Sequence, residues 1–400
     1  MSYSELSYNL TKQLDKDAKK QEGIYFTPPK TIVKVLDTIK PYMGSIQNIL
    51  EPSCGSCEFI NAIHQKYPEK QILGIEHNHH IYQNIKHFSN ENITLLHGDF
   101  LKYKSSPVYN LIIGNPPYFV IGKQEVHQKY LPYFDGRPNI FILFIIHSLS
   151  LLKPDGLLCF VLPKCFMNSF YYDKTRKYIA KHFQIIDLFD CCDSYIETKQ
   201  ETFVLIVRNC VPEKTSKHIF QIQNQTIFGT YDNVEKFTQL LENSTTLKEL
   251  GFRVSIGTVV WNQVKELLTN DETKTRLIYS SNIENKQFVY KTYTNESKKS
   301  FINKPGLRGP MLVLNRGYGT GTYNFEYCLL NVDFNYLIEN HLMCVHYEKD
   351  HRPQQLIELY QKIIRSFENP KTQDFVKHYF GNSAINSTEL NTILPIYFEN

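Results

Sequence analysis

The segment of the sequence with the clearest chemical potential is residues 109–119, Tyr-Asn-Leu-Ile-Ile-Gly-Asn-Pro-Pro-Tyr-Phe. Its apolar run, residues 111–113, predicts a buried parallel strand, and Asn115 follows at the carboxyl end. The two prolines after Asn115 fix the backbone and remove two N–H donors, which leaves the Pro116 carbonyl oxygen without a local partner. Together with the ring of Tyr118, these groups form a receptor for a flat ring that carries an exocyclic amino group. An ordinary strand-to-loop turn is the competing interpretation of Asn-Pro-Pro taken alone.

The elements that would position this turn are an alternating series of short apolar strands and amphipathic helices between residues 47 and 209. The alternation is typical of a doubly wound α/β sheet, in which ligands bind outside the carboxyl ends of the strands. Three further strands also end in polar residues, namely Glu51, Glu76 and Asp99. We therefore expect these residues and Asn115 to share one extended site. The predicted strands are centred on Ile49, Leu73, Leu95, Ile112, Phe160, Ile186 and Leu205.

The polar residues also indicate the kind of cofactor. Glu76 lies about 20 residues past the first strand-to-helix turn, where a carboxylate binds the hydroxyls of a ribose. That turn, residues 51–59, lacks the glycine fingerprint that cradles a pyrophosphate, and Glu51 would repel an anion but attract an ammonium group. These features favour S-adenosylmethionine, with its ribose, adenine, sulfonium and ammonium groups, and disfavour a dehydrogenase. Two simpler interpretations stay open, in which Glu51 caps the following helix and Asp99 is a turn residue.

Taken together, these motifs resemble those of the gamma-group adenine-N6 DNA methyltransferases, the modification enzymes of restriction-modification systems. The resemblance covers nearly the whole chain. Thr27-Pro-Pro matches the family's amino-terminal cofactor motif, and residues 51–55, Glu-Pro-Ser-Cys-Gly, match its first-strand motif. The order of the motifs, with a long domain after the catalytic one, is the gamma arrangement. The residues that the resemblance assigns to cofactor binding are Thr27, Glu51, Ser53, Gly55, Glu76, Asp99 and Phe100.

The resemblance implies direct methyl transfer from S-adenosylmethionine to the N6 amino group of an adenine in double-stranded DNA. Asn115 and the Pro116 carbonyl would accept the two amino hydrogens, and Tyr118 would stack on the base. The base must be flipped out of the duplex, and Phe144 and Phe203 would line the pocket that receives it. Either phenylalanine is equally expected in a hydrophobic core. Related turns occur in methyltransferases that act on RNA, on cytosine N4 or on a protein glutamine, so these acceptors stay open.

Two local features carry further expectations. Thr27 precedes Pro28 as the predicted N-cap of a helix that begins at Pro28 or Pro29, and capping alone would explain this motif. Cys57 stands where the family usually has a second glycine in the first-strand loop. Its Cβ is expected to crowd the methionine portion of the cofactor. That departure is the basis of a second hypothesis, a DNA-binding module with a silent methyltransferase domain.

We predict two domains, a catalytic methyltransferase domain over residues 1–244 and a mixed α+β target-recognition domain over residues 245–400. The second contains a basic run between residues 286 and 316, interleaved with aromatic residues and with Glu296 as its one acid. Such a run suits DNA phosphates, although a solvated loop would have the same composition. Residues 255–263 and 310–319 resemble parts of the target-recognition domains of related enzymes. The basic residues assigned to DNA binding are Lys298, Lys299, Lys304, Arg308 and Arg316.

Composition limits the remaining functions. The chain has 400 residues, 42% of them hydrophobic, and a net charge of +4, so any nucleic-acid surface is a local patch. The cysteines are scattered, the polar amino terminus lacks an apolar signal core, and the longest apolar run, residues 140–146, is too short to span a bilayer. We therefore expect an intracellular protein without a membrane role, and the cysteine spacing predicts no metal site. We also expect a monomer that binds double-stranded DNA, with any cognate restriction endonuclease acting as a separate protein.

Overall fold

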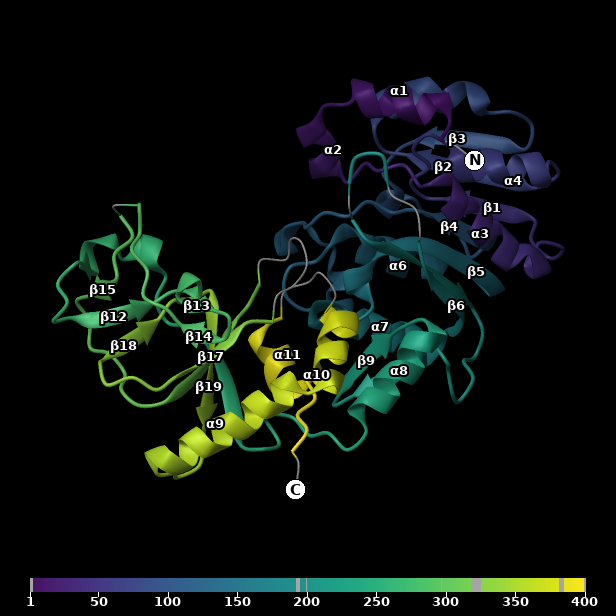
Figure 1. Cartoon of the computed structure of the whole chain (residues 1–400). Coiled ribbons are helices and arrows are strands. Elements are labelled where there is room, and N and C mark those ends of the chain that lie inside the picture. The colour runs from purple at the N-terminus through teal and green to yellow at the C-terminus, as the bar shows by residue number, and fades with distance from the viewer. Residues whose placement is uncertain are drawn as a thin grey trace. The chain divides into compact units, whose positions relative to one another are not determined.

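The computed structural model describes residues 3–191, 195–198, 200–295, 297–317, 325–380 and 385–398. The chain divides into two compact units, Met1–Val234 and Glu235–Asn400 (Figure 1). The first unit contains a seven-stranded sheet, and the second contains two four-stranded sheets. The expected combination of an α/β sheet with a second, mixed α+β part is therefore confirmed.

The large sheet has the strand order β3-β2-β1-β4-β5-β7-β6. Strands β1 to β5 pair in parallel, whereas β7 pairs antiparallel with both β5 and β6. All seven strands predicted from the sequence are present. They could be predicted because a buried parallel strand has a short continuous run of apolar residues. Their bounds are β1 Asn48–Glu51, β2 Gln71–Glu76, β3 Ile93–His97, β4 Tyr109–Gly114, β5 Leu152–Pro163, β6 Gln184–Asp190 and β7 Thr202–Arg208.

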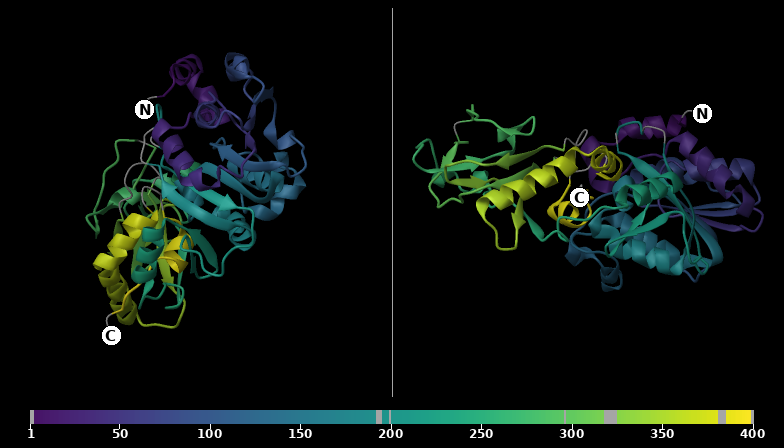
Figure 2. Two further views of the ribbon diagram at one scale, coloured as in Figure 1. Left: turned by 90° about the vertical axis from the view of Figure 1, so that its right-hand side faces the viewer. Right: turned by 60° about the horizontal axis from the view of Figure 1, so that its bottom comes forward.

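Helices cover both faces of this sheet (Figures 1 and 2). Successive side chains of a strand point to opposite faces, so Leu111 and Ile113 of β4 pack on one side and Ile112 on the other. The side of Leu111 is covered by α1, α3, α4 and α5, and the side of Ile112 by α6 and α7. The helices are α1 Glu5–Gln13, α2 Lys16–Glu22, α3 Pro29–Ile39, α4 Glu58–Lys66, α5 His79–Ile85, α6 Ile140–Leu151 and α7 Asp173–His182, and a hairpin of β8 Ile219–Ile222 and β9 Gln225–Phe228 follows the sheet.

Helix α3 begins at Pro29, so its N-cap position is one residue after Thr27, the predicted N-cap. Pro29 is its first residue, Pro28 holds the N-cap position, and no side chain caps the helix. The prediction that Thr27 is the N-cap is therefore wrong. A proline in the first turn has a preset φ and no N–H to satisfy, so this helix begins without a side-chain cap. Thr27 is instead buried.

The second unit contains two small sheets, and three α-helices follow its last described strand. One sheet has the order β10-β19-β16-β17 and the other β11-β15-β12-β18, with a β13-β14 hairpin beside them. The amphipathic helix expected around Tyr360 is α9, which buries Leu356, Tyr360 and Ile363. The elements are α8 Tyr231–Leu241, β10 Phe252–Ile256, β11 Leu268–Thr269, β12 Thr275–Ile278, β13 Ile283–Glu284, β14 Gln287–Phe288, β15 Phe301–Ile302, β16 Met311–Asn315, β17 Tyr327–Leu330, β18 Tyr336–Ile338, β19 Leu342–Tyr347, α9 Pro353–Glu368, α10 Pro370–Phe375 and α11 Ser387–Thr392.

The division between the units falls inside α8, between Val234 and Glu235. Phe237 of this helix packs edge-on against Phe375 and Tyr379, with ring centroids 5.6 Å apart in both pairs. The helix thus contributes its apolar face to the second unit, ten residues ahead of the boundary expected after residue 244. No described helix of either unit is both long and apolar enough to cross a membrane.

Glu389 gives a pH-dependent prediction for the second unit. Its carboxylate accepts a hydrogen bond from the Asn386 N–H at the start of α11, and burial raises the pKa of Glu389 to about 7. A folded-state pKa above the unfolded value means that stability present at acid pH is lost as pH rises through about 7. We predict that Glu389→Gln, which keeps the cap, raises the unfolding free energy by up to about 3 kcal/mol at pH 8.5 and little at pH 5. Urea unfolding at the two pH values checks this, and a pH-independent difference would contradict it.

Candidate active site

A cavity of ≈ 260 Å³ opens at the carboxyl ends of the parallel strands in the first unit. Seven of the residues predicted to form a site line it together, although they are spread over some ninety positions of the sequence. They reach it because β1, β2 and β4 are neighbours in the sheet and end at the same edge. The predicted residues on its wall are Ser53, Gly55, Glu76, Asp99, Phe100, Asn115 and Phe144.

Glu76 is held at the end of β2 by two backbone amides. One carboxylate oxygen accepts a hydrogen bond from the Gly55 N–H at 2.8 Å, and the other accepts one from the Asn78 N–H at 2.7 Å. Burial raises the pKa of Glu76, and the two amide bonds oppose that rise. The carboxylate is thereby fixed on the cavity wall, where it can accept hydrogen bonds from a diol such as a ribose.

Glu51 and Thr27 lie just outside the cavity lining and are both buried. Burial raises the pKa of Glu51 well above its usual range, and the nearby Cys57 raises it further. The Oε2 atom of Glu51 has no hydrogen-bond partner. The side chain of Cys57, the N-cap residue of α4, makes no cap hydrogen bond, whereas hydrogen bonding of Glu51 to the Ile60 backbone in the first turn of that helix lowers the pKa of Glu51. This contact agrees with the interpretation that Glu51 caps α4. A buried carboxylate with one unpartnered oxygen is costly unless a cation approaches that oxygen.

Asp99 and Phe100 form the part of the wall after β3. Asp99 accepts a hydrogen bond from the Leu101 N–H at 3.0 Å, so it stabilises the turn as well as facing the cavity. The Phe100 ring is buried and lies with its centroid 5.0 Å from that of Phe144 and 4.8 Å from that of His147. These rings give the cavity an apolar surface beside the Asp99 carboxylate, which suits a flat heterocycle with polar edges.

The turn after β4 presents Asn115 in a fixed orientation. Its amide nitrogen donates to the Tyr25 carbonyl oxygen at 3.0 Å, and its Oδ1 accepts a hydrogen bond from the Tyr118 hydroxyl. The Ser53 hydroxyl donates to the Asn115 carbonyl oxygen at 3.2 Å. Burial raises the pKa of Tyr118, so its hydroxyl remains a donor, and it also lies 2.7 Å from the Val161 carbonyl oxygen. The amide donor is thus used inside the protein, and the acceptor oxygen keeps a second lone pair.

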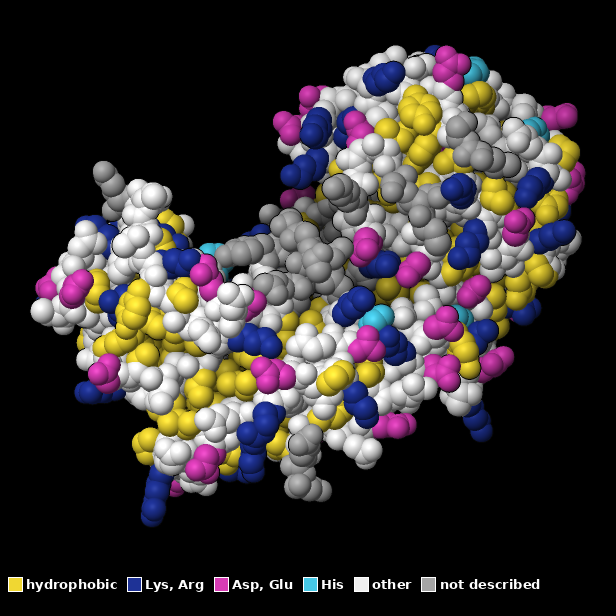
Figure 3. Space-filling view, in the orientation of Figure 1, with side chains coloured by type: hydrophobic (Ala, Val, Ile, Leu, Met, Phe, Trp, Pro, Cys, Tyr) yellow, Lys and Arg dark blue, Asp and Glu magenta, His cyan; other side chains and the backbone are white. Residues whose placement is uncertain are grey.

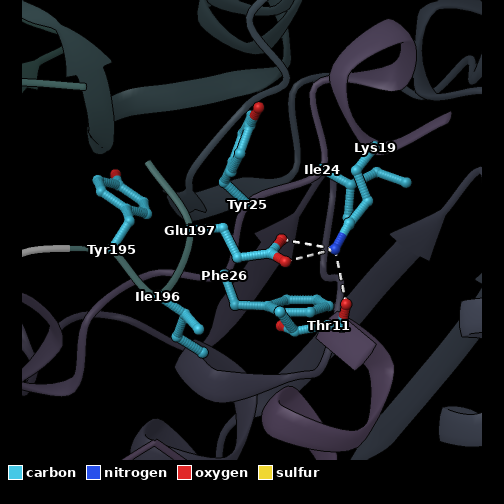
Figure 4. Close-up of a pocket in the computed structure, with 8 residues that line it drawn as sticks. All are labelled: Thr11, Lys19, Ile24, Tyr25, Phe26, Tyr195, Ile196 and Glu197. Carbon is cyan, nitrogen blue, oxygen red and sulfur yellow. Dashed lines mark hydrogen bonds and ion pairs between the residues drawn. The ribbon is translucent and has the colours of Figure 1, made fainter. Parts of the chain in front are cut away.

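Tyr195 is a site residue that the sequence did not reveal. Its ring packs edge-on against Tyr25, with centroids 6.5 Å apart (Figure 4). After burial, Tyr195 is the next largest cause of the raised pKa of Tyr118. Hydrogen bonding to Tyr118 and Asn115 partly offsets the rise that burial causes in the pKa of Tyr195. A lone tyrosine in the polar segment between β6 and β7 was the available signal, but only the pairing of β7 with β5 and of β5 with β4 brings it beside Asn115.

Phe144 and Phe203 have different surroundings. Phe144 lies on the cavity wall, whereas Phe203 is fully buried and stacks on Phe166 with centroids 6.4 Å apart and an interplanar angle of 9°. Phe203 is in β7, which has strands on both sides and helices over both faces. The structure therefore places Phe203 in the hydrophobic core and not on the cavity wall.

The basic residues predicted to bind DNA differ in their surroundings. The Lys298 ammonium lies 4.2 Å from the ring centroid of Tyr279 and 4.4 Å from that of Tyr293, and burial lowers its pKa. Arg316 donates to the Asn340 carbonyl oxygen at 3.3 Å. Lys304 and Arg308 are exposed and Lys299 is half-buried. Figure 3 likewise shows Lys and Arg side chains interspersed with acidic ones over the face that it draws. Glu296, and the last two residues of 310–319, lie outside the described residues.

Cys57 differs from the expectation that its Cβ crowds the cofactor. Its side chain is fully buried in the core beneath α3 and α4 and is not on the cavity wall. Its backbone has φ 63°, the left-handed conformation that favours glycine. The side chain thus points away from the cavity. A residue with a Cβ at this position destabilises the fold through its left-handed backbone conformation and not by contact with the cofactor. Within the part of the chain that the structure describes, no three His, Cys, Asp or Glu side chains are grouped to hold a metal ion.

Comparisons with known proteins agree with this site. Residues 10–196 match the Eco57I restriction-modification methylase family. The chain is 26% identical to the type II methyltransferase M.CvrRI of Paramecium bursaria Chlorella virus XZ-6E and 24% identical to the modification methylase CviBIII of Paramecium bursaria Chlorella virus NC1A, over 99% of each chain in both cases. A solved DrdV–DNA complex is similar over 98% of this chain and 57% of that one, with TM-score 0.55 and 13% identity. These findings support a methylase of the restriction-modification type, and the family match implies S-adenosylmethionine as its cofactor.

The residues present fit that cofactor. A cationic ligand group would stabilise the buried carboxylate of Glu51, and Glu76 offers a fixed carboxylate to a ribose. The backbone of Gly55, at φ 49°, passes close to the Phe26 ring, so a Cβ there would lie 3.3 Å from that ring. The loop provides no cluster of glycines to cradle phosphates, in agreement with a cofactor that has none.

The left-handed backbone at Cys57 yields a stability prediction. Cys57→Gly should be about 1 kcal/mol more stable than Cys57→Ala, because alanine keeps the strained φ and glycine does not. A matched control is Cys159, which is equally buried but lies in the extended strand β5. There the order should reverse, with Cys159→Ala more stable than Cys159→Gly. Denaturant unfolding of the four variants decides, and the same order at both positions would contradict the account.

Proposed function

We propose that this chain transfers a methyl group from S-adenosylmethionine to the N6 amino group of an adenine that is flipped out of double-stranded DNA at a specific sequence. It would thus be a gamma-group adenine methyltransferase, the modification half of a restriction-modification system. The observation that carries the proposal is the fixed Asn115 amide on the cavity wall, whose nitrogen donates to the Tyr25 carbonyl oxygen and whose Oδ1 accepts a hydrogen bond from Tyr118. The matches to restriction-modification methylases support the same reaction class.

The chemistry follows from the acceptors at this turn. An adenine amino group is a poor nucleophile because its lone pair is delocalised into the ring. Asn115 Oδ1 and the Pro116 carbonyl oxygen would accept its two hydrogens, which favours a tetrahedral nitrogen whose lone pair is directed at the methyl donor. The cofactor supplies an electrophilic methyl group on its sulfonium. No nucleophilic side chain is needed, so the reaction would proceed by one direct transfer: the new C–N bond would form as the C–S bond of the sulfonium breaks, S-adenosylhomocysteine would leave as a neutral thioether, and the methylated nitrogen would lose one proton to solvent.

Aromatic residues beside Asn115 would hold the flipped base. Tyr118 and Tyr195 are both next to the Asn115 amide, and each base–aromatic stack contributes roughly 1–3 kcal/mol. That range is similar to the few kcal/mol that extraction of a base from a duplex costs. Phe144 would then contribute to the cavity wall between the base and the cofactor.

The second unit would provide the contacts to DNA. Lys304 and Arg308 are its exposed members of the predicted set, so we assign phosphate contacts to them first. Lys298 lies among aromatic rings, so we assign it to the interior of the recognition surface. A monomer suffices for this arrangement, and a cognate endonuclease would act separately.

The acceptor is tested by offering several classes to the purified protein with S-adenosylmethionine labelled in its methyl group. We expect label in unmethylated double-stranded genomic DNA and none above background in RNA or in a protein mixture. Sequencing of the methylated positions then gives the recognition sequence. Label in RNA or protein alone would contradict the proposal, as would binding of cofactor with no transfer to DNA.

Removal of the Asn115 amide tests the catalytic assignment. Asn115→Ala should lower the rate of methyl transfer by at least about 100-fold, because one of the two acceptors for the amino hydrogens is lost. Cofactor affinity, measured by calorimetry, should fall far less than the rate, by less than about tenfold, because the variant loses the Asn115–Tyr25 bond of the strap but keeps Glu76 and the Glu22–Asn78 bond. Asn84→Ala on α5, whose side chain bonds only its own helix at His80, is the control and should leave both quantities unchanged. A near-normal rate in Asn115→Ala would refute the assignment.

A further inference from the structure

An ion pair between the buried Lys19 and the exposed Glu197 has no part in the chemistry described so far (Figure 4). The Lys19 ammonium is 2.7 Å and 2.6 Å from the two carboxylate oxygens of Glu197 and 2.6 Å from the Thr11 carbonyl oxygen. Its three hydrogens are therefore all accounted for. The Lys19 side chain is 5% exposed and that of Glu197 34% exposed. The ammonium is buried while the carboxylate reaches solvent, so removal of Glu197 leaves Lys19 with the Thr11 carbonyl oxygen and no charged partner in this contact.

The pair joins two segments that belong to different parts of the site. Lys19 is in α2, directly ahead of residues 22–26, which line the cofactor cavity and are called the strap below. Glu197 follows two residues after Tyr195, whose ring lies against Tyr25 of the strap. The ion pair and the Tyr25–Tyr195 contact line the same small pocket. The pair thus connects the wall of the cofactor cavity to the aromatic side of the acceptor position.

The strap has anchors of its own that do not involve Lys19. The Asn78 amide donates to the Glu22 carboxylate at 2.9 Å, and the Asn115 amide donates to the Tyr25 carbonyl oxygen at 3.0 Å. Gly23, at φ 65°, packs so closely on the catalytic turn that a Cβ would lie 2.6 Å from the Tyr118 nitrogen. The Tyr195 hydroxyl is held from the other side by hydrogen bonding to Tyr118 and Asn115 and by a longer bond, 3.4 Å, to the Thr202 hydroxyl. If the ion pair is lost, the strap keeps its own anchors, whereas the backbone beside Tyr195 loses its charged link to α2.

We infer that Lys19 and Glu197 are positioning residues that hold Tyr195 where it receives the flipped base. The inference rests on the proposed function, because Tyr195 can act on a base only if one enters beside Asn115. The pair would preorganise the base-receiving pocket and leave the cofactor cavity as it is. Its loss should weaken capture of the flipped base and slow methyl transfer while cofactor affinity stays the same.

The test uses the full chain and three variants. Glu197→Gln removes the charge with little change of shape, and Glu201→Gln makes the same change at an exposed position nearby and serves as the control. The double variant Lys19→Met with Glu197→Gln removes both charges and so avoids an unpaired buried ammonium. Each protein is checked by thermal unfolding and by its affinity for S-adenosylmethionine before activity is measured.

Base capture is read from a DNA duplex with 2-aminopurine at the methylated position, since its fluorescence rises when it leaves the stack. Glu197→Gln and the double variant should both show at least about tenfold weaker capture and a similar loss in kcat, with cofactor affinity within about twofold. Glu201→Gln should match the unaltered protein.

Two results would overturn the inference. One is equal base capture by Glu197→Gln and Glu201→Gln. The other is recovery of capture and kcat in the double variant, which would mean that the pair contributes only to stability. If the unaltered protein neither methylates DNA nor raises the fluorescence, the proposed function itself is wrong. That result differs from the two above, which concern only the variants.

Discussion

The site depends on one constraint, the parallel pairing of β1 with both β2 and β4. In this register the carboxyl ends of the three strands meet at one edge of the sheet, and each places a polar residue there. Glu51, Glu76 and Asn115 are far apart in the sequence, yet the pairing alone brings them together. The strap then closes on this edge through the bond from Asn115 to the Tyr25 carbonyl, so that the same backbone lines the cofactor cavity and orients the catalytic amide.

This arrangement buries two carboxyl groups, those of Glu51 and Glu76. Burial raises the pKa of both Glu51 and Glu76, which means that the folded protein without a ligand holds these groups in an unfavourable state near neutral pH. A cationic cofactor relieves the penalty at Glu51, and the hydroxyls of a ribose can donate to Glu76. Functional sites commonly store instability of this kind, and its relief by the ligand contributes to specificity for a ligand with that charge.

Much of the fold was predictable because its signals are local. The strands at Ile49, Leu73 and Ile112 are continuous apolar runs, and each polar residue at their ends could be assigned to the site from that position alone. Predictions were wrong or incomplete where tertiary packing decides. Thr27 does not cap α3 because Pro29 makes a cap unnecessary, and Phe203 lies in the core because β7 is enclosed on both faces. Tyr195 could not be found from the sequence, since its partner Tyr25 is far away along the chain and only the assembled sheet brings the two rings together.

The central claim is that the Asn115 turn directs a methyl group to the N6 atom of adenine in DNA. The most direct measurement is mass spectrometry of nucleosides after unmethylated DNA has reacted with S-adenosylmethionine that carries a deuterated methyl group. The account predicts N6-methyladenine whose mass exceeds that of the natural form by the difference between three deuterium and three hydrogen atoms, with no labelled cytosine. Deuterium on cytosine N4 would keep the fold and the direct transfer but contradict the assigned base, and the absence of any labelled nucleoside despite cofactor binding would contradict the account as a whole.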